Sequence, residues 1–172
     1  VTPWVALEDA ARSVFPRYGY GELRTPIFER TQVFTGSIGE ETEVVQKEMY
    51  TFEDRGGRSL TLRPEGTAGV LRAIARTGLQ QGEEKRVFYF GPMFRGERPA
   101  AGRRRQFHQV GVEAVGRANP YVDAECIAMG MRYLEHVGVG DVELLLNSRG
   151  VAEERPAATE GMMTYFSQHE SA

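Results

Sequence analysis

Two stretches of alternating residues, separated by an arginine-rich segment, constrain the fold more than any other feature of the sequence. Residues 87–90 (VFYF) lead into the segment and residues 107–113 (FHQVGVE) leave it, both with the two-residue period of a β-strand. Pro99 and Gly102 lie between them and favour a loop. The segment also carries five arginines, which are Arg95, Arg98, Arg103, Arg104 and Arg105. The pattern predicts two antiparallel strands joined by a long basic loop.

Such a loop can hold several phosphates, because each guanidinium offers a planar fork of donors that matches phosphate oxygens. A solvated basic hairpin is the alternative for an arginine run alone. The exit strand favours a ligand site, since its two-residue period places an aromatic ring, an amide, a gap and a carboxylate on one face. The residues of this face are Phe107, Gln109, Gly111 and Glu113.

Three motifs of the chain resemble a known family. FRxERP followed by GRxRQFHQxGxE, within residues 94–113, is similar to motif 2 of the class II aminoacyl-tRNA synthetases in the form carried by histidyl-tRNA synthetases. Residues 19–29 (GYGELRTPIFE) resemble motif 1 of that class, and residues 63–69 (RPEGTAG) match the histidyl family. The resemblance covers nearly all 172 residues. It implies the first part of a catalytic domain, with motif 3 and the anticodon-binding domain absent from this chain.

The resemblance implies a site for ATP. In amino-acid activation the substrate carboxylate attacks the α-phosphate of ATP, so the protein must hold two anions together. Arg95 would bridge the two anions and is the predicted catalytic residue. Arg103 or Arg105 would reach the outer phosphates, whose charge is shared by the Mg²⁺ of the ATP complex. Phe107 would stack on adenine, and Glu97 would accept a hydrogen bond from the adenine amino group.

The resemblance also implies a pocket for the amino acid. Glu65, Gly66, Thr67 and Gln109 would hold the α-ammonium group of histidine, and Glu113 would accept a hydrogen bond from an imidazole N–H. The residues alone leave an alternative for Glu65. A carboxylate at the start of a helix interacts favourably with the helix dipole and needs no ligand to do so.

We therefore expect a histidine–tRNA ligase whose partners are histidine, ATP and tRNA(His), and a homodimer with Pro26 of motif 1 at the interface. Two other functions are open: a catalytically inactive, synthetase-like subunit that senses histidine for histidine biosynthesis, and a plain RNA-binding module. The arginine loop favours the enzyme, because a sensor needs no clamp for ATP phosphates. The 172 residues alone are predicted to have weak or no adenylation activity.

Charge and motif content exclude several other classes. The net charge of −3 gives no general attraction to nucleic acid, so contact with a polyanion must come from the arginine loop. The sequence lacks the P-loop pattern and the spacings typical of zinc sites. The single cysteine, Cys126, permits no intramolecular disulfide and fits a reducing compartment. Because there is no apolar run of membrane length and no signal pattern, we expect a cytoplasmic protein.

The remaining patterns predict a mixed α+β fold, in which an antiparallel sheet is flanked by helices. The helical predictions are residues 4–15, 64–76 and 123–137, a helical turn within 30–39, and a last helix at 149–169 that is interrupted near Pro156. The strand predictions are an edge strand at 22–28, a hairpin at 50–62 and a buried apolar strand at 142–147. Residues 115–121 are predicted to be a turn-rich connector.

Overall fold

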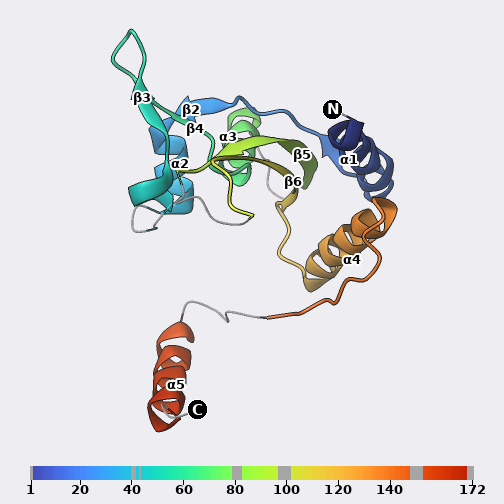
Figure 1. Cartoon of the computed structure of the whole chain (residues 1–172), viewed down its shortest axis with the longest axis vertical. Helices are drawn as coiled ribbons and strands as arrows, with labels where there is room; N and C mark the ends of the chain where they lie inside the picture. The colour runs from blue at the N-terminus through green and yellow to red at the C-terminus, as the bar shows by residue number, and fades with distance from the viewer. Residues whose placement is uncertain are drawn as a thin grey trace. The chain divides into compact units, whose positions relative to one another are not determined.

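The computed structural model describes residues 2–39, 42, 44–78, 83–96, 102–147 and 153–169. The chain divides into two compact units, residues 1–140 and 141–172 (Figure 1). The first unit contains every strand found among the described residues, arranged as two three-stranded sheets. The predicted α+β fold is therefore confirmed, with one parallel strand pair in addition to the antiparallel pairs.

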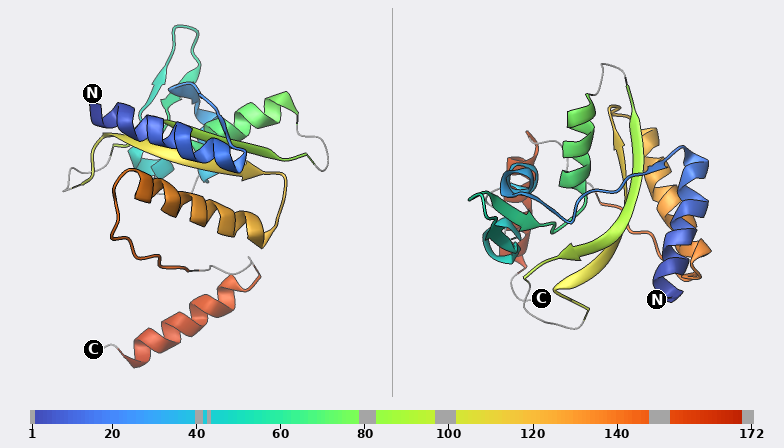
Figure 2. Two further views of the ribbon diagram at one scale, coloured as in Figure 1. Left: turned by 90° about the vertical axis from the view of Figure 1, so that its right-hand side faces the viewer. Right: turned by 90° about the horizontal axis from the view of Figure 1, so that it is seen from above.

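The first sheet is built around the two strands that flank the basic loop. β5 (Lys85–Phe94) and β6 (Gln106–Val115) are antiparallel, with register running from Lys85↔Val115 to Phe94↔Gln106. β1 (Gly21–Glu22) pairs in parallel with the other edge of β5. Figure 2 shows α1 (Thr2–Val14) and α4 (Pro120–His136) on one face of this sheet and α3 (Thr67–Thr77) on the opposite face. The sheet thus separates two layers of helix.

The alternation of β5 supplies a core to each layer. Phe88 packs with Phe15, Tyr20 and Met129 on the side of α1 and α4. On the side of α3, the buried members are Val70, Ile74, Tyr89 and Met93. Because successive side chains of a strand point to opposite faces, the odd-numbered residues of β5 face α3. The 3-10 helix η1 (Phe15–Tyr18) carries Phe15 into the first of these cores.

The second sheet has the strand order β2-β4-β3 and is antiparallel throughout. β3 (Thr51–Glu53) and β4 (Ser59–Leu62) form the predicted hairpin at 50–62, and β2 (Phe28–Arg30) pairs with the other edge of β4. α2 (Thr31–Ile38) follows β2 and confirms the predicted helical turn, while the short π-helix η2 (Val44–Glu48) precedes β3.

The prediction of one strand over residues 22–28 is wrong. β1 ends at Glu22 and joins the first sheet, whereas β2 begins at Phe28 and joins the second. The chain between them crosses from one sheet to the other, so its carbonyls find partners outside a ladder: Arg63 Nη1 donates to Thr25 O at 3.0 Å. Pro26, which has no N–H to donate, is exposed in this crossover.

The connector predicted at residues 115–121 contains a helix start instead. Asn119 caps α4, and its side-chain oxygen accepts a hydrogen bond from Tyr121 N at 2.9 Å. Pro120 occupies the first turn of the helix, where its missing N–H costs nothing. The Asn-Pro pair is therefore the beginning of α4, three residues earlier than the pattern predicted.

In the second unit, the predicted strand at 142–147 is wrong. These residues form no strand, and Leu145 and Leu146 are 81% and 72% exposed. A strand needs a neighbour to satisfy its backbone groups, and no described residue pairs with this segment. α5 (Arg155–Gln168) has Pro156 in its first turn, so the proline begins the helix and does not interrupt it. No helix in the described ranges is long and apolar enough to cross a membrane.

Candidate functional site

The candidate site lies where the N-terminus of α3 meets the odd-numbered face of β6. Thr67 Oγ1 donates a hydrogen bond of 2.6 Å to Glu113 Oε1. Phe107 packs against the α3-side core. The two-residue period therefore predicted correctly that Phe107 and Glu113 share one face of β6, which is the face covered by α3.

The side chain of Glu65, which precedes the N-cap residue Gly66, binds the first turn of the helix that carries Thr67. One carboxylate oxygen accepts a hydrogen bond from Ala68 N at 2.9 Å, and the other accepts from Thr67 N. These bonds satisfy two N–H groups that a helix start leaves unpaired. The alternative for Glu65, a carboxylate that serves the helix, is thus realised in the structure. The same bonds fix the carboxylate beside Thr67, the residue that contacts Glu113.

Tyr89 lies beside Glu65, Thr67 and Glu113, and these four residues are called the acidic cluster below. The sequence patterns did not single out Tyr89. It is 4% exposed, and its hydroxyl donates to Glu113 Oε1 at 3.4 Å. Gly66 and Gly111 leave room for its ring, because a Cβ on Gly66 would lie 2.1 Å from the ring and one on Gly111 would lie 2.4 Å from it. The sequence feature that could have pointed to Tyr89 is Gly111, which pairs with Tyr89 across the two strands.

Burial governs the electrostatics of the cluster. Loss of solvation raises the pKa of Glu113, and the negative charge of Glu65 raises it further, while hydrogen bonds from Thr67 and Tyr89 act in the opposite direction. Burial also raises the pKa of Tyr89 to about 12. Tyr89 therefore stays protonated at neutral pH and remains a hydrogen-bond donor to the carboxylate.

Replacing Glu113 with glutamine is expected to stabilise the protein at neutral pH. Because the pKa of Glu113 is higher in the folded state than in the unfolded chain, ionisation of Glu113 opposes folding, and this effect grows as the pH rises between the two pKa values. Thermal unfolding should show a higher Tm for Glu113→Gln than for the wild type at about pH 7 and a smaller difference at about pH 4. Glu53→Gln, which alters an exposed carboxylate on β3, is the control. An equal difference at both pH values would contradict the expectation.

Arg95 lies just beyond the end of β5 and joins the cluster from the loop. Its Nε donates to Pro64 O at 2.9 Å, and its guanidinium carbon lies 5.2 Å from the centre of the Phe107 ring. Its backbone N–H donates to Arg105 O at 3.0 Å and closes the base of the loop. The guanidinium thus lies beside the residue that precedes Glu65, on the same side of the sheet as Phe107.

The other predicted phosphate ligands remain at the edge of this arrangement. Arg103 and Arg105 are exposed. Glu97, the predicted partner of the adenine amino group, lies outside the described residues. The structure therefore brings Arg95 to Phe107 and Pro64, and Thr67 to Glu113, while the loop contacts stay predictions.

Gln109 offers an open acceptor. Its Oε1 atom is buried and has no hydrogen-bond partner among the described residues. A buried acceptor without a partner is costly, and a ligand ammonium group would supply the missing donor. No group of three or more His, Cys, Asp or Glu residues in the described ranges could hold a metal ion.

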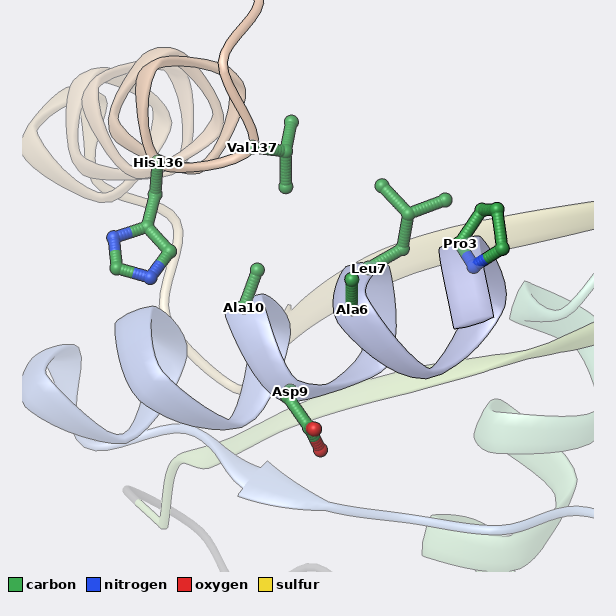
Figure 3. Close-up of a pocket in the computed structure, with 7 residues that line it drawn as sticks. All are labelled: Pro3, Ala6, Leu7, Asp9, Ala10, His136 and Val137. Atoms are coloured by element: carbon green, nitrogen blue, oxygen red, sulfur yellow. The ribbon is translucent and has the colours of Figure 1, made fainter. Parts of the chain in front are cut away.

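A separate hollow of about 500 Å³ lies between α1 and α4 (Figure 3). It is lined mainly by Pro3, Ala6, Leu7, Ala10 and Val137, with the ring of His136 at one side and Asp9 at its margin. This hollow is on the face of the sheet opposite α3 and contains none of the predicted site residues.

Comparison with a solved structure establishes the class of protein. The apo histidyl-tRNA synthetase from S. aureus matches with a TM-score of 0.71 and 38% identity, covering 98% of this chain and 40% of that chain. The fold, with Arg95 just beyond the end of β5 and Glu113 on β6, is part of a class II aminoacyl-tRNA synthetase catalytic domain.

Sequence comparison establishes the family within this class. The histidyl-tRNA synthetase family model matches residues 4–160. The histidine–tRNA ligase of Halothermothrix orenii is 52% identical over 168 residues, covering 97% of this chain and 40% of the relative. The histidine–tRNA ligase of Acaryochloris marina is 54% identical over 167 residues, covering 96% of this chain and 39% of the relative. The chain belongs to the histidyl-tRNA synthetase family, and it spans about 40% of the length of these relatives.

Proposed function

We propose that this chain forms part of a histidine–tRNA ligase, which activates histidine with ATP and transfers it to tRNA(His) in the cytoplasm. The observation that carries the proposal is the position of Arg95 relative to the acidic cluster. Arg95 contacts Pro64, the next residue is Glu65, and Thr67 bonds to Glu113. A cation that would attract phosphate is thus bonded to residue 64, and a carboxylate that would attract a cationic amino acid is bonded to residue 67 of the same segment.

In the proposed reaction, a carboxylate oxygen of histidine attacks the α-phosphorus of ATP, and pyrophosphate leaves with the electrons of the broken P–O bond. Arg95 would donate hydrogen bonds to both reacting anions, which lowers their mutual repulsion and stabilises charge that develops at phosphorus. Mg²⁺ would arrive with ATP as part of the substrate. Arg103 or Arg105 would bind the outer phosphates and Glu97 the adenine amino group. Adenine would stack on the ring of Phe107, whose centre lies 5.2 Å from the guanidinium carbon of Arg95.

The acidic cluster would hold histidine. The α-ammonium group would donate to Glu65, to Thr67 and to the open acceptor of Gln109, against the backbone of Gly66. The imidazole N–H would donate to Glu113, whose position is fixed by Thr67 and Tyr89. A side chain without an N–H would cover this half-buried carboxylate without giving it a further donor, so the same contact would give selectivity.

Histidine-dependent exchange of pyrophosphate into ATP tests the proposal, because exchange requires adenylate formation and its reversal. The intact ligase that contains this chain should exchange with histidine and not with leucine, whereas the 172 residues alone are expected to show weak exchange or none. Histidine binding without any ATP affinity would instead favour a histidine-sensing regulatory subunit. Binding to RNA with a steep dependence on salt, and no affinity for histidine or ATP, would favour an RNA-binding module.

We further propose that the protein is a homodimer whose interface includes Pro26 and the neighbouring face of the second sheet. Pro26 and Ile27 are exposed there, and Phe28 and Phe52 are 51% and 43% exposed with their ring centres 6.2 Å apart. Exposed aromatic residues that cluster together are typical of an interface.

The double variant Phe28→Glu and Phe52→Glu should shift the sedimentation coefficient from that of a dimer to that of a monomer, because burying two carboxylates at the interface is costly. The control is Tyr121→Glu, which puts the same charge on an exposed aromatic position of α4. A dimer that survives the double variant would contradict the proposed interface.

A further inference from the structure

Arg63 is a buried arginine whose bonds go to backbone and hydroxyl oxygens. It is 7% exposed, and its Nε donates to Pro92 O at 2.8 Å. Its Nη1 donates to Thr25 O at 3.0 Å and to Thr25 Oγ1 at 3.1 Å. Burial lowers the pKa of this guanidinium. Since a buried charge is costly, its presence here calls for an explanation.

The guanidinium lies on the α3 face of the sheet, in a gap that a glycine provides. Gly91 alternates with Tyr89 and Met93, which both belong to the α3-side core. Its φ of +144° favours glycine, and a Cβ there would lie 2.5 Å from Arg63 Nη2. Gly91 also pairs with Gln109 across β5 and β6. Arg63 therefore fills the position next to Tyr89 on the face that carries the candidate site.

Residues 63 and 64 also hold the end of β5 by two further bonds. Phe94 N donates to Arg63 O at 2.9 Å. Arg95 Nε donates to Pro64 O, also at 2.9 Å. Together with the bond from Arg63 Nε to Pro92 O, these contacts attach residues 92–95 to the segment that leads into Glu65 and Thr67. The distance between Arg95 and the acidic cluster depends on this attachment.

We propose that Arg63 is a positioning residue for Arg95. Its planar guanidinium attaches the end of β5 to residues 63–67, the segment that carries Glu65 and Thr67. This attachment holds Arg95 where the two reacting anions would meet. This inference rests on the proposed function. It assigns Arg63 no contact with substrate. Its effect on the reaction passes through Arg95.

Arg63→Lys separates geometry from charge, because lysine keeps a cation but has no planar fork to reach Pro92 and Thr25 together. We expect kcat for histidine-dependent pyrophosphate exchange to fall by about 100-fold, the cost of a displacement of about 1 Å. The KM for histidine should change by less than about threefold, since the pocket residues keep their own contacts. Thr25→Val keeps the shape of the side chain and removes the hydroxyl that accepts a hydrogen bond from Arg63, so it should lower kcat by a smaller factor. This variant replaces Arg63→Lys in the test if Arg63→Lys does not fold.

A double-mutant cycle with Arg95→Lys tests whether Arg63 acts through Arg95. Once Arg95 is replaced, Arg63→Lys should lower kcat by less than about threefold. The matched control is Arg72→Lys, which alters a half-buried arginine of α3 that pairs with Glu29, and it should leave kcat unchanged. Losses that multiply in the double variant would overturn the positioning role and leave the proposed function intact. An intact wild-type ligase without histidine-dependent exchange would overturn both.

Discussion

Arg95→Ala is expected to lower kcat for histidine-dependent pyrophosphate exchange by about 100- to 1000-fold, the effect of removing one donor that stabilises transition-state charge. The physical reason is the placement of Arg95. Its Nε is held by Pro64 O on one side, and its guanidinium lies over Phe107 on the other. The bond to Pro64 O ties the guanidinium to the residue that precedes Glu65. The affinity for histidine alone should fall by a smaller factor than kcat, because the pocket would lose one contact to the carboxylate and would keep Glu65, Thr67 and Glu113.

Arg104→Ala is the matched control for this variant, since Arg104 is an exposed arginine of the same loop to which no role is assigned. Its loss should change kcat by less than about threefold, as expected for a solvated charge. Equal losses for the two variants would mean that only the total positive charge of the loop matters. The bridging role of Arg95 would then be wrong.

Glu113→Ala is expected to weaken histidine binding by about 2–4 kcal/mol, which is the cost of removing the acceptor for a buried imidazole N–H. Calorimetry with histidine measures this directly. Affinity for ATP should not change, because no predicted nucleotide contact involves Glu113. Full histidine affinity in Glu113→Ala would show that the imidazole binds elsewhere. Glu53→Ala, on the exposed hairpin, is the control.

The alternation of the sequence predicted the strands and the faces of this site well. β5 and β6 were found because their side chains follow the two-residue period, and that period alone places Phe107 and Glu113 on the same side. The helix after Glu65 followed from its start signals and apolar spacing. These features depend on neighbouring residues, so a sequence can report them.

Contacts between distant segments were not predictable in the same way. Tyr89 looked like an ordinary core aromatic, because its role depends on two glycines brought to it by α3 and β6. The sequence placed Arg63 in a motif but gave it no role, because its bonding partners Thr25 and Pro92 are 38 and 29 residues away along the chain. The break between β1 and β2 arises from a parallel pairing that no local pattern encodes.

One measurement tests the central claim most directly, namely that the nucleotide and histidine bind side by side around Arg95 and Glu113. Calorimetry with histidyl-sulfamoyl adenosine, which joins the two ligands as the adenylate does, should give an affinity more than about 100-fold higher than histidine or AMP alone. Both Arg95→Ala and Glu113→Ala should weaken it. An analogue that binds no more tightly than its parts, or that is insensitive to one of the two variants, would contradict a shared site.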